Sequence, residues 1–273
     1  MRMKIEFYLL FTGLLIQTAV MHAQQSDTIR ITAKDINTRY LREGTHRYLV
    51  YAKMKKDSVR VLTQFWTRTI KRTDYNGKPA IEITQEWEDK DSVMHIVKSY
   101  SDAKTMQPLY HHTWWNLPVA RNSATKKVSS TIVDEGNSTV TYNGMQLSDA
   151  DTVKQVKKIW DGYKSAAGKY YLNWHLDLET FPLLPYKKGI TFIVPFYDPG
   201  TASDFQTVAY AVKGEAELEG YDQQKISCWL LVHESPGNKE TFWISKKTRE
   251  VLKLEQVFGP GVYRYKIKLG FSN

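Results

Sequence analysis

Short runs of β-forming residues alternate with turn signals along most of the chain, and this recurrence limits the fold more than any other feature. Residues 58–71 and 79–88 are rich in Val, Ile, Thr and aromatic residues, the types that favour strands. Asn76-Gly77 lies between them and predicts a hairpin, because both residue types tolerate the positive φ angles of a type I′ turn. Turn signals recur about every 8–12 residues, the spacing of a sandwich or barrel. Further strands are expected at 46–52, 92–101, 110–116, 127–133, 139–143, 189–196, 207–219, 224–233, 240–245, 251–257 and 262–269.

The middle of the sequence breaks this pattern. Apolar residues recur at helical spacing within residues 149–169, and Asp149 or Asp151 is placed to cap such a helix. The next stretch contains Pro182 and Pro185, which limit any helix there to a few turns. We therefore expect a short helical insertion that plugs or edges the sheet.

These patterns together predict a mainly β protein with an antiparallel, strongly curved sheet or open barrel. Residues 24–273 are expected to form a single β-rich domain, or two β halves that flank the helical segment at about residues 149–186. The sequence carries no signal of oligomeric state.

The N-terminus has the form of a secretory signal peptide. Arg2 and Lys4 precede an apolar stretch that ends near Ala23, and a polar run follows. Gln17 and Thr18 interrupt the stretch, which makes it too short for a spanning helix of about 20 apolar residues. We expect residues 1–23 to be removed near Ala23, giving an exported, periplasmic or secreted protein whose mature chain has no transmembrane segment. No cysteine lies near the cut, so a lipoprotein anchor is not expected.

Composition narrows the class of protein further. Aromatic residues make up 13% and charged residues 25% of the 273 residues, which excludes intrinsic disorder. The single cysteine excludes an internal disulfide framework. The basic residues behind the net charge of +9 are dispersed, and a solvated surface is their expected role. Such a surface also attracts anions, and an exported protein meets lipid headgroups, lipopolysaccharide and acidic glycans before nucleic acid. No nucleic-acid motif is present.

The sequence contains no motif that carries catalysis or metal binding. It lacks the H-E-x-x-H and C-x-x-C spacings and the G-x-S-x-G elbow. His111 and His112 would point to opposite faces of a strand, so the pair cannot chelate one ion. Cys228 lies in an apolar strand, where a buried structural thiol is expected. Glu86 and Glu88 share one strand face, and a solvated face is their expected role. We predict no catalytic residue, metal or cofactor.

The aromatic residues are the best candidates for a binding surface. Large rings can line an apolar cavity or stack on sugars, although most are expected to fill the concave side of a curved sheet. Trp114 and Trp115 are adjacent, so their rings face opposite ways on a strand. The candidate ligand-binding residues are Trp66, Trp87, Trp114, Trp115 and Trp174.

The last third of the chain carries a family resemblance. Trp243-Ile244-Ser245 followed by a turn and a return strand, and Phe181-Pro182-Leu183-Leu184-Pro185 before Lys188-Gly189, are similar to segments of the DUF3108 family of exported bacterial proteins of unknown function. The resemblance is strongest over residues 170–269. It implies a strongly curved antiparallel sheet or open barrel and an exported location, and it carries over no catalytic residue.

Three functions follow from these observations. The first is a non-enzymatic envelope protein that binds an apolar or amphipathic ligand, or an envelope polymer such as a lipid or glycan, on its curved sheet. The second is an envelope hydrolase whose site is assembled from dispersed residues; a carboxylate pair or a Ser–His contact in a cleft would support it. The third is a structural partner of an outer-membrane assembly.

Overall fold

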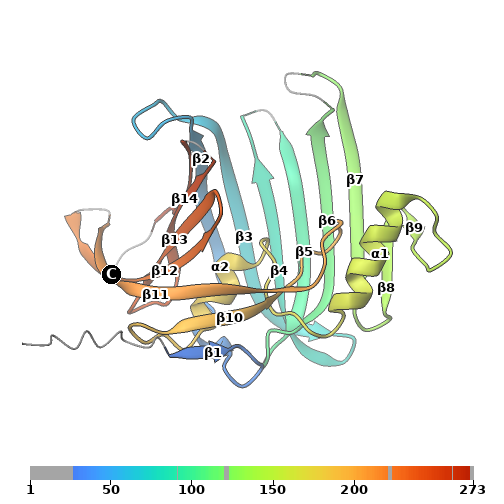
Figure 1. Cartoon of the computed structure of the whole chain (residues 1–273), viewed down its shortest axis with the longest axis horizontal. Helices are drawn as coiled ribbons and strands as arrows, with labels where there is room; N and C mark the ends of the chain where they lie inside the picture. The colour runs from blue at the N-terminus through green and yellow to red at the C-terminus, as the bar shows by residue number, and fades with distance from the viewer. Residues whose placement is uncertain (1–26, 91, 120–122, 221–222, 260, 271–273) are drawn as a thin grey trace, which may run out of the picture.

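A single sheet dominates the computed structural model, which describes residues 27–90, 92–119, 123–220, 223–259 and 261–270. These residues form a sheet of 15 strands (Figure 1). The strands are β1 (Thr28–Arg30), β2 (Gly44–Lys53), β3 (Val61–Tyr75), β4 (Lys78–Glu88), β5 (Val93–Asp102), β6 (Pro108–Pro118), β7 (Lys126–Asp134), β8 (Thr139–Tyr142), β9 (Met145–Gln146), β10 (Thr191–Phe196), β11 (Gln206–Glu219), β12 (Lys225–Ser235), β13 (Asn238–Ser245), β14 (Val251–Phe258) and β15 (Val262–Lys268). The helical elements are η1 (Thr38–Tyr40), α1 (Lys154–Ala166), α2 (Asp177–Thr180) and η2 (Phe181–Leu183).

The strand order joins two runs of consecutive strands. The sheet reads β1-β10-β11-β12-β13-β14-β15-β2-β3-β4-β5-β6-β7-β8-β9, so β15 pairs with β2 and links the runs. β1 lies parallel to β10, and the other neighbouring strands are antiparallel. Because β1 and β9 are the two edges and do not pair, the sheet is not closed into a barrel. The expected open, antiparallel architecture is confirmed.

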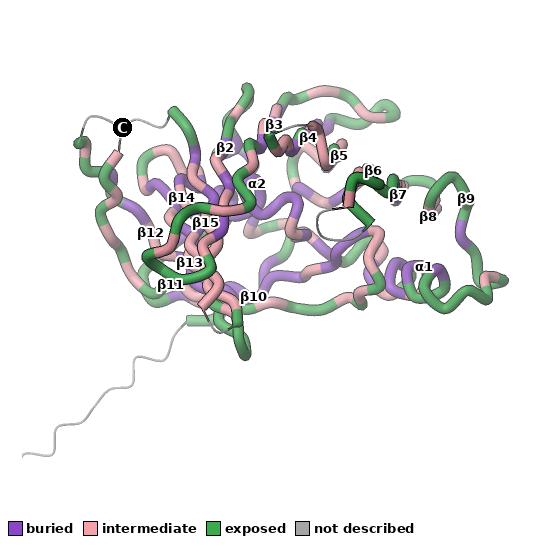
Figure 2. The backbone as a smooth tube through the Cα atoms, turned by 90° about the horizontal axis from the view of Figure 1, so that it is seen from above, coloured by how far each residue is buried: buried purple, intermediate pink, exposed green. Residues whose placement is uncertain are grey.

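The sheet curves around the short helical insertion. Figures 1 and 2 show β10 and β11 facing the long strands β3 to β5, with α2 on the concave side. Phe181, in η2, lies at the centre of the main core, and its ring centroid is 4.6 Å from that of Phe242 on β13 and 4.7 Å from that of Tyr210 on β11. Ile70 and Ile83 close this core from β3 and β4. α2 and η2 therefore plug the concave side of the sheet.

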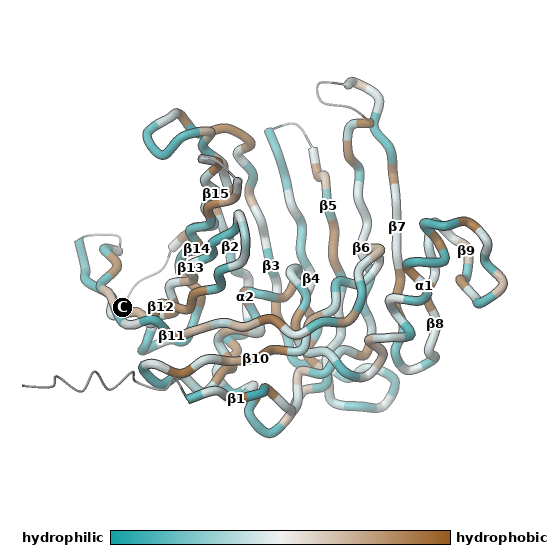
Figure 3. Tube along the Cα trace, in the orientation of Figure 1, coloured by the Kyte–Doolittle hydropathy of each residue, from teal (hydrophilic) through white to brown (hydrophobic). Residues whose placement is uncertain are grey.

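Along the strands, hydrophobic and hydrophilic residues are mixed rather than separated into long stretches (Figure 3). On β3, Trp66 and Ile70 are buried, whereas Phe65 is 45% exposed. Phe65 therefore lies on the outer face of the sheet. Trp66 and Ile70 lie on the inner face. Glu86 is exposed, as expected for a solvated strand face, whereas Glu88 is half-buried. Glu215, Glu217 and Glu219 on β11 are exposed as well.

A second, smaller core lies under α1, where Ile159 and Tyr163 pack on Val133 and Val140 of β7 and β8. The predicted caps of this helix are wrong. Its N-cap is Val153, which makes no side-chain capping bond. The carboxylate of Asp149 instead accepts from Trp160 and Lys164, and that of Asp151 accepts from the Ser148 amide. The predicted signal peptide, residues 1–23, lies outside the described residues.

The packing of α1 depends on one glycine. A Cβ added to Gly162 would lie 2.2 Å from the backbone oxygen of Ser203. Alanine gains about 1 kcal/mol of helix propensity over glycine, but overpacking against a backbone atom costs about 1–3 kcal/mol. We expect Gly162→Ala to lower the free energy of unfolding by up to about 2 kcal/mol in urea titrations. Gly214→Ala on β11 adds the same methyl with no atom within 4 Å, and a comparable loss there would contradict the packing explanation.

Candidate functional site

Two buried ion pairs hold α2 against the concave side of the sheet. Arg68, on β3, donates from Nε to Glu179 Oε1 at 2.6 Å and also pairs through Nη2 with Glu179 Oε2. Its Nη1 donates to Gln85 Oε1 at 2.9 Å. Lys266, on β15, pairs with Asp177 at the start of α2. Buried charges of this kind are stable only when paired and hydrogen-bonded, so these contacts fix the position of α2 and of the chain that precedes it.

Four tryptophan rings converge beside this anchor. Trp66 and Trp87 are directly opposite in the β3–β4 register, and their rings stack with centroids 3.6 Å apart. The ring of Trp115, on β6, lies edge-on to Trp87 at 5.6 Å, and that of Trp174, just before α2, lies at 6.0 Å. The edge-to-face contacts of Trp115 and Trp174 with Trp87 are of a kind that aromatic rings favour. Three strands and the segment before α2 thus contribute to one aromatic cluster.

These rings line a cavity of about 290 Å³, which we call the tryptophan cavity. Gln64 and Arg264 are the strongly polar side chains among its lining residues. Met54 and Leu62 also line it and are 55% and 73% exposed, so its opening has an apolar rim. Other apolar residues of the lining are Val50, Ala52, Met94, Phe258 and Val262.

The structure brings together four of the five tryptophans singled out from the sequence. Trp66, Trp87, Trp115 and Trp174 line the cavity, whereas Trp114 does not. Alternation along β6 places Trp114 on the opposite face from Trp115. Trp114 therefore lies on the outer face of the strand, away from this cavity.

Sequence reasoning missed a group of buried histidines next to these rings. His95, on β5, is opposite Trp115 in the register, and the two rings stack at 3.4 Å. The His175 ring lies 5.0 Å from that of His95 and 5.2 Å from that of His111. We call these three residues, together with Asp198, the histidine cluster. The sequence contained a signal for two of the three histidines. His95 shares a strand face with Val97, and His111 shares one with Trp115, so burial of these apolar neighbours would also bury the two histidines.

Several polar atoms of the histidine cluster lack hydrogen-bond partners among the described residues. His95 Nδ1 donates to the Trp114 carbonyl at 2.8 Å, which leaves its Nε2 as an acceptor without a donor. His111 Nε2 and both ring nitrogens of His175 are also unpaired. Asp198 Oδ2 accepts from Trp174 Nε1 at 2.6 Å, while its Oδ1 is 3.8 Å from His175 Nδ1.

Burial sets the charge of this cluster. It lowers the pKa values of His95 and His111 to about 3 and holds the pKa of His175 well below its usual value, because a charged imidazole is poorly solvated there. Burial also raises the pKa of Asp198 to about 7, although the hydrogen bond from Trp174 acts in the opposite direction. The three imidazoles are therefore neutral at pH 7.

A serine–histidine contact is present, but it lacks the other parts of a hydrolase site. Ser99 Oγ and His111 Nδ1 are 2.7 Å apart. Both side chains are buried, and neither lines a cavity described in this section. A triad also needs an acid that orients the imidazole, and His111 Nε2 has no hydrogen-bond partner among the described residues.

The remaining candidates for chemistry are structural. Cys228 is fully buried, as expected, and burial raises the pKa of its thiol to about 11, which disfavours the reactive thiolate. Among the described ranges, no three His, Cys, Asp or Glu side chains are placed to hold a metal ion. None of the helices in the described part of the chain is long and apolar enough to cross a membrane.

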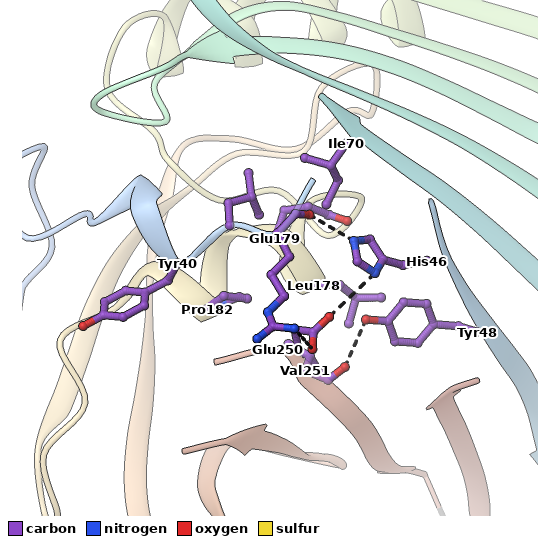
Figure 4. Close-up of a pocket in the computed structure, with 11 residues that line it drawn as sticks. Tyr40, His46, Tyr48, Ile70, Leu178, Glu179, Pro182, Glu250 and Val251 are labelled. Atoms are coloured by element: carbon purple, nitrogen blue, oxygen red, sulfur yellow. Dashed lines mark hydrogen bonds and ion pairs between the residues drawn. The ribbon is translucent and has the colours of Figure 1, made fainter. Parts of the chain in front are cut away.

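A small cavity near η1 and β2 illustrates the difference from the tryptophan cavity (Figure 4). It is lined by Tyr48, Glu250 and Val251 among others and has a volume of about 20 Å³, room for about one water molecule. Tyr48 donates to the Val251 carbonyl at 3.0 Å, and His46 Nδ1 lies 3.7 Å from Glu250 Oε1. This space is too small for an organic ligand.

Two further cavities are larger than this small cavity, and their linings are more polar than that of the tryptophan cavity. One of about 590 Å³ lies between η1 and the segment after η2 and is lined by charged residues including Lys34, Arg39 and Arg249. Another of about 200 Å³ lies beside β11 and β13, with Asp177 and Glu240 in its lining. The tryptophan cavity combines an apolar lining with enough volume for part of an organic ligand.

Comparison with known proteins identifies the family but not an activity. The sequence profile of DUF3108, a protein family of unknown function, matches residues 47–268. The chain belongs to the DUF3108 family. The resemblance expected from residues 170–269 is thus confirmed and extends through β2 to β9. A search of curated proteins gives no match for this DUF3108 protein.

One solved structure is similar to this DUF3108 protein in outline. It is a β-barrel-like protein of a domain of unknown function, DUF1849, from Brucella abortus, with 7% sequence identity and a TM-score of 0.36. The match covers 84% of this chain and 97% of the other.

Proposed function

We propose that this protein is an exported, non-enzymatic binding protein that takes the apolar part of an amphipathic ligand into the tryptophan cavity. The observation that carries the proposal is the convergence of Trp66, Trp87, Trp115 and Trp174 on one cavity with an apolar lining. Ligand sites are typically concave and mainly apolar, with a few polar groups that orient the ligand. Export rests on the form of the N-terminal segment, residues 1–23.

The rim of the cavity supports a site that an apolar group can enter. Leu62 lines it, is 73% exposed and has a φ of 52°. A bulky residue rarely adopts positive φ, and exposing it to water costs further free energy. An apolar ligand at the rim would cover this side chain and that of Met54.

The lining favours an acyl-type chain over a glycan. A sugar presents many hydroxyl groups that need partners, whereas Gln64 and Arg264 are the strongly polar side chains available, and Gln64 Oε1 already accepts from Trp66 Nε1. Trp66 and Trp87 are only 1% and 3% exposed, so they offer little ring face for stacking on a sugar. The volume of about 290 Å³ lies at the lower end of the range for ligand pockets, about 300–1,000 Å³. One chain, rather than a multi-chain lipid, fits it.

The test is a titration with the neutral apolar dye N-phenyl-1-naphthylamine, followed by its own fluorescence and by displacement with 1-decanol. The native protein should bind the dye and release it to decanol. Trp115→Ala should raise the Kd for the dye at least about tenfold, the equivalent of about 1.4 kcal/mol, because a large ring of the lining is lost.

Trp114→Ala is the matched control, since it removes the neighbouring residue of the same type from the opposite face of β6. It should leave dye affinity within about twofold of the native value, a free-energy difference of about 0.4 kcal/mol. No saturable binding by the native protein, or equal losses in the two variants, would contradict the proposal. Displacement by a soluble oligosaccharide but not by decanol would favour a glycan ligand instead.

A further inference from the structure

Arg264 places a cation in the lining of an otherwise apolar cavity. It lies on β15, lines the tryptophan cavity, and its guanidinium carbon is 5.3 Å from the centroid of the Trp66 ring. The ring of Trp87 is stacked on the same Trp66 ring. The guanidinium is therefore held at the aromatic cluster, where an aromatic face stabilises a cation.

The neighbouring interior cations Arg68 and Lys266 have carboxylate partners, whereas Arg264 has none among the described residues. Arg68 pairs with Glu179, and Lys266 pairs with Asp177. Within the described residues, Arg264 has no carboxylate within 4.0 Å and no side-chain hydrogen bond. This leaves one guanidinium whose donors are free to bind an anion.

The nearby carboxylates are engaged elsewhere. The cross-strand register places Gln256, on β14, between Arg264 and Glu240, and Gln256 Nε2 donates to Glu240 Oε1 at 2.8 Å. Asp177 is bound by Lys266. Burial lowers the pKa of Arg264 from its usual value, although Asp177 and Glu240 act in the opposite direction. The loss of hydration is thus only partly offset by these two carboxylates.

We propose that Arg264 selects the headgroup of the ligand, so that the tryptophan cavity takes a single-chain amphiphile with an anionic head, such as a carboxylate or phosphate. This rests on the proposed function, since the chain of the same molecule occupies the apolar cavity. A guanidinium is the side chain best suited to such a head, because it presents a planar fork of donors. A neutral head gains no ion pair there, and a cationic head is repelled.

The experiment compares decanoate, 1-decanol and decylammonium as competitors for the bound dye at pH 8, with equal chain lengths. The native protein should bind decanoate at least about tenfold more tightly than decanol, and decylammonium more weakly than decanol, in keeping with the strength of charge-assisted hydrogen bonds. Arg264→Gln should bind decanol as the native protein does but lose the preference for decanoate. Retained decanol binding also shows that this variant is folded.

Arg60→Gln is the control for a general effect of charge. Arg60 is exposed, and its guanidinium carbon lies 5.4 Å from the ring of Tyr51, which lines the cavity, but Arg60 does not line it. This variant should keep the full preference for decanoate. Equal affinity of the native protein for decanoate and decanol would overturn the headgroup assignment while leaving the cavity proposal intact. A preference that survives in Arg264→Gln would also overturn it, and failure of all three compounds to displace the dye would overturn both proposals.

Discussion

Replacing Glu179 by glutamine is expected to lower the free energy of unfolding by about 3–5 kcal/mol, the range for removing one partner of a buried ion pair. The substitution leaves the Arg68 guanidinium charged in the interior, with side-chain exposures of 1% for Arg68 and 2% for Glu179 in the native protein. Urea unfolding followed by circular dichroism measures the change. Because α2 is held by this pair, the loss should also raise the Kd of the tryptophan cavity for its dye.

Two further variants separate the charge effect from general damage. Arg68→Met combined with Glu179→Leu removes both charges and should recover most of the lost stability, since apolar replacement of a whole pair is often neutral. Glu234→Gln breaks the surface pair with Lys239, whose side chains are 52% and 58% exposed, and should change stability by about 0–1 kcal/mol. A loss after Glu179→Gln no larger than that after Glu234→Gln would contradict the anchoring role of the buried pair.

Acidification is expected to destabilise the protein steeply through the histidine cluster. Below the unfolded-state histidine pKa of 6.5, the unfolded chain binds three protons at His95, His111 and His175 that the folded chain does not. Asp198, with its pKa raised to about 7, has the opposite sign, because the folded chain holds one proton that the unfolded chain releases above pH 3.8. The net difference is two protons, so stability falls by about 3 kcal/mol per pH unit between roughly pH 5.5 and 4.

Unfolding titrations across this range measure the slope directly. His111→Gln removes one of the three protons and should reduce the slope by about 1.4 kcal/mol per pH unit. Val97→Ala is the control, because Val97 is buried on the same face of β5 as His95 and carries no titratable group. It should lower stability by the same amount at every pH. A slope unchanged by His111→Gln would show that the cluster does not set the acid sensitivity.

The positions of the strands could be predicted because their signals are local. The Asn76-Gly77 turn has φ values of 52° and 77°, as the type I′ signal indicates. Which face of each strand points into the concave side of the sheet could not be predicted. Alternation assigns residues to two faces, but it does not show which face is covered by other elements. On β6 the packing of the insertion against the concave side decides that Trp115, and not Trp114, is inside.

The site depends on contacts between residues far apart in the chain. Arg68 and Glu179 are separated by 111 positions, and neither residue stands out in the local pattern. Alternation along β3 puts Arg68 on the same face as Trp66 and Ile70, but an arginine is usually exposed, and nothing local indicates the carboxylate that lets it be buried. Trp174 was recognisable as aromatic, but its place beside Trp87 follows from the tertiary position of α2.

The pairing of β15 with β2 has a consequence for the order in which the molecule is assembled. β2 to β9 can form hairpin by hairpin as the chain is synthesised, and so can β10 to β15, whereas the seam joins residues such as Tyr263 and Lys53 from opposite ends of the domain. Closing a loop of this length has a high entropic cost and slows folding. Arg264 and Val262 lie on β15, the last strand along the described part of the chain. The tryptophan cavity therefore takes its final form only after β15 has been synthesised and has paired with β2, and a chain truncated before β15 would lack part of the cavity lining.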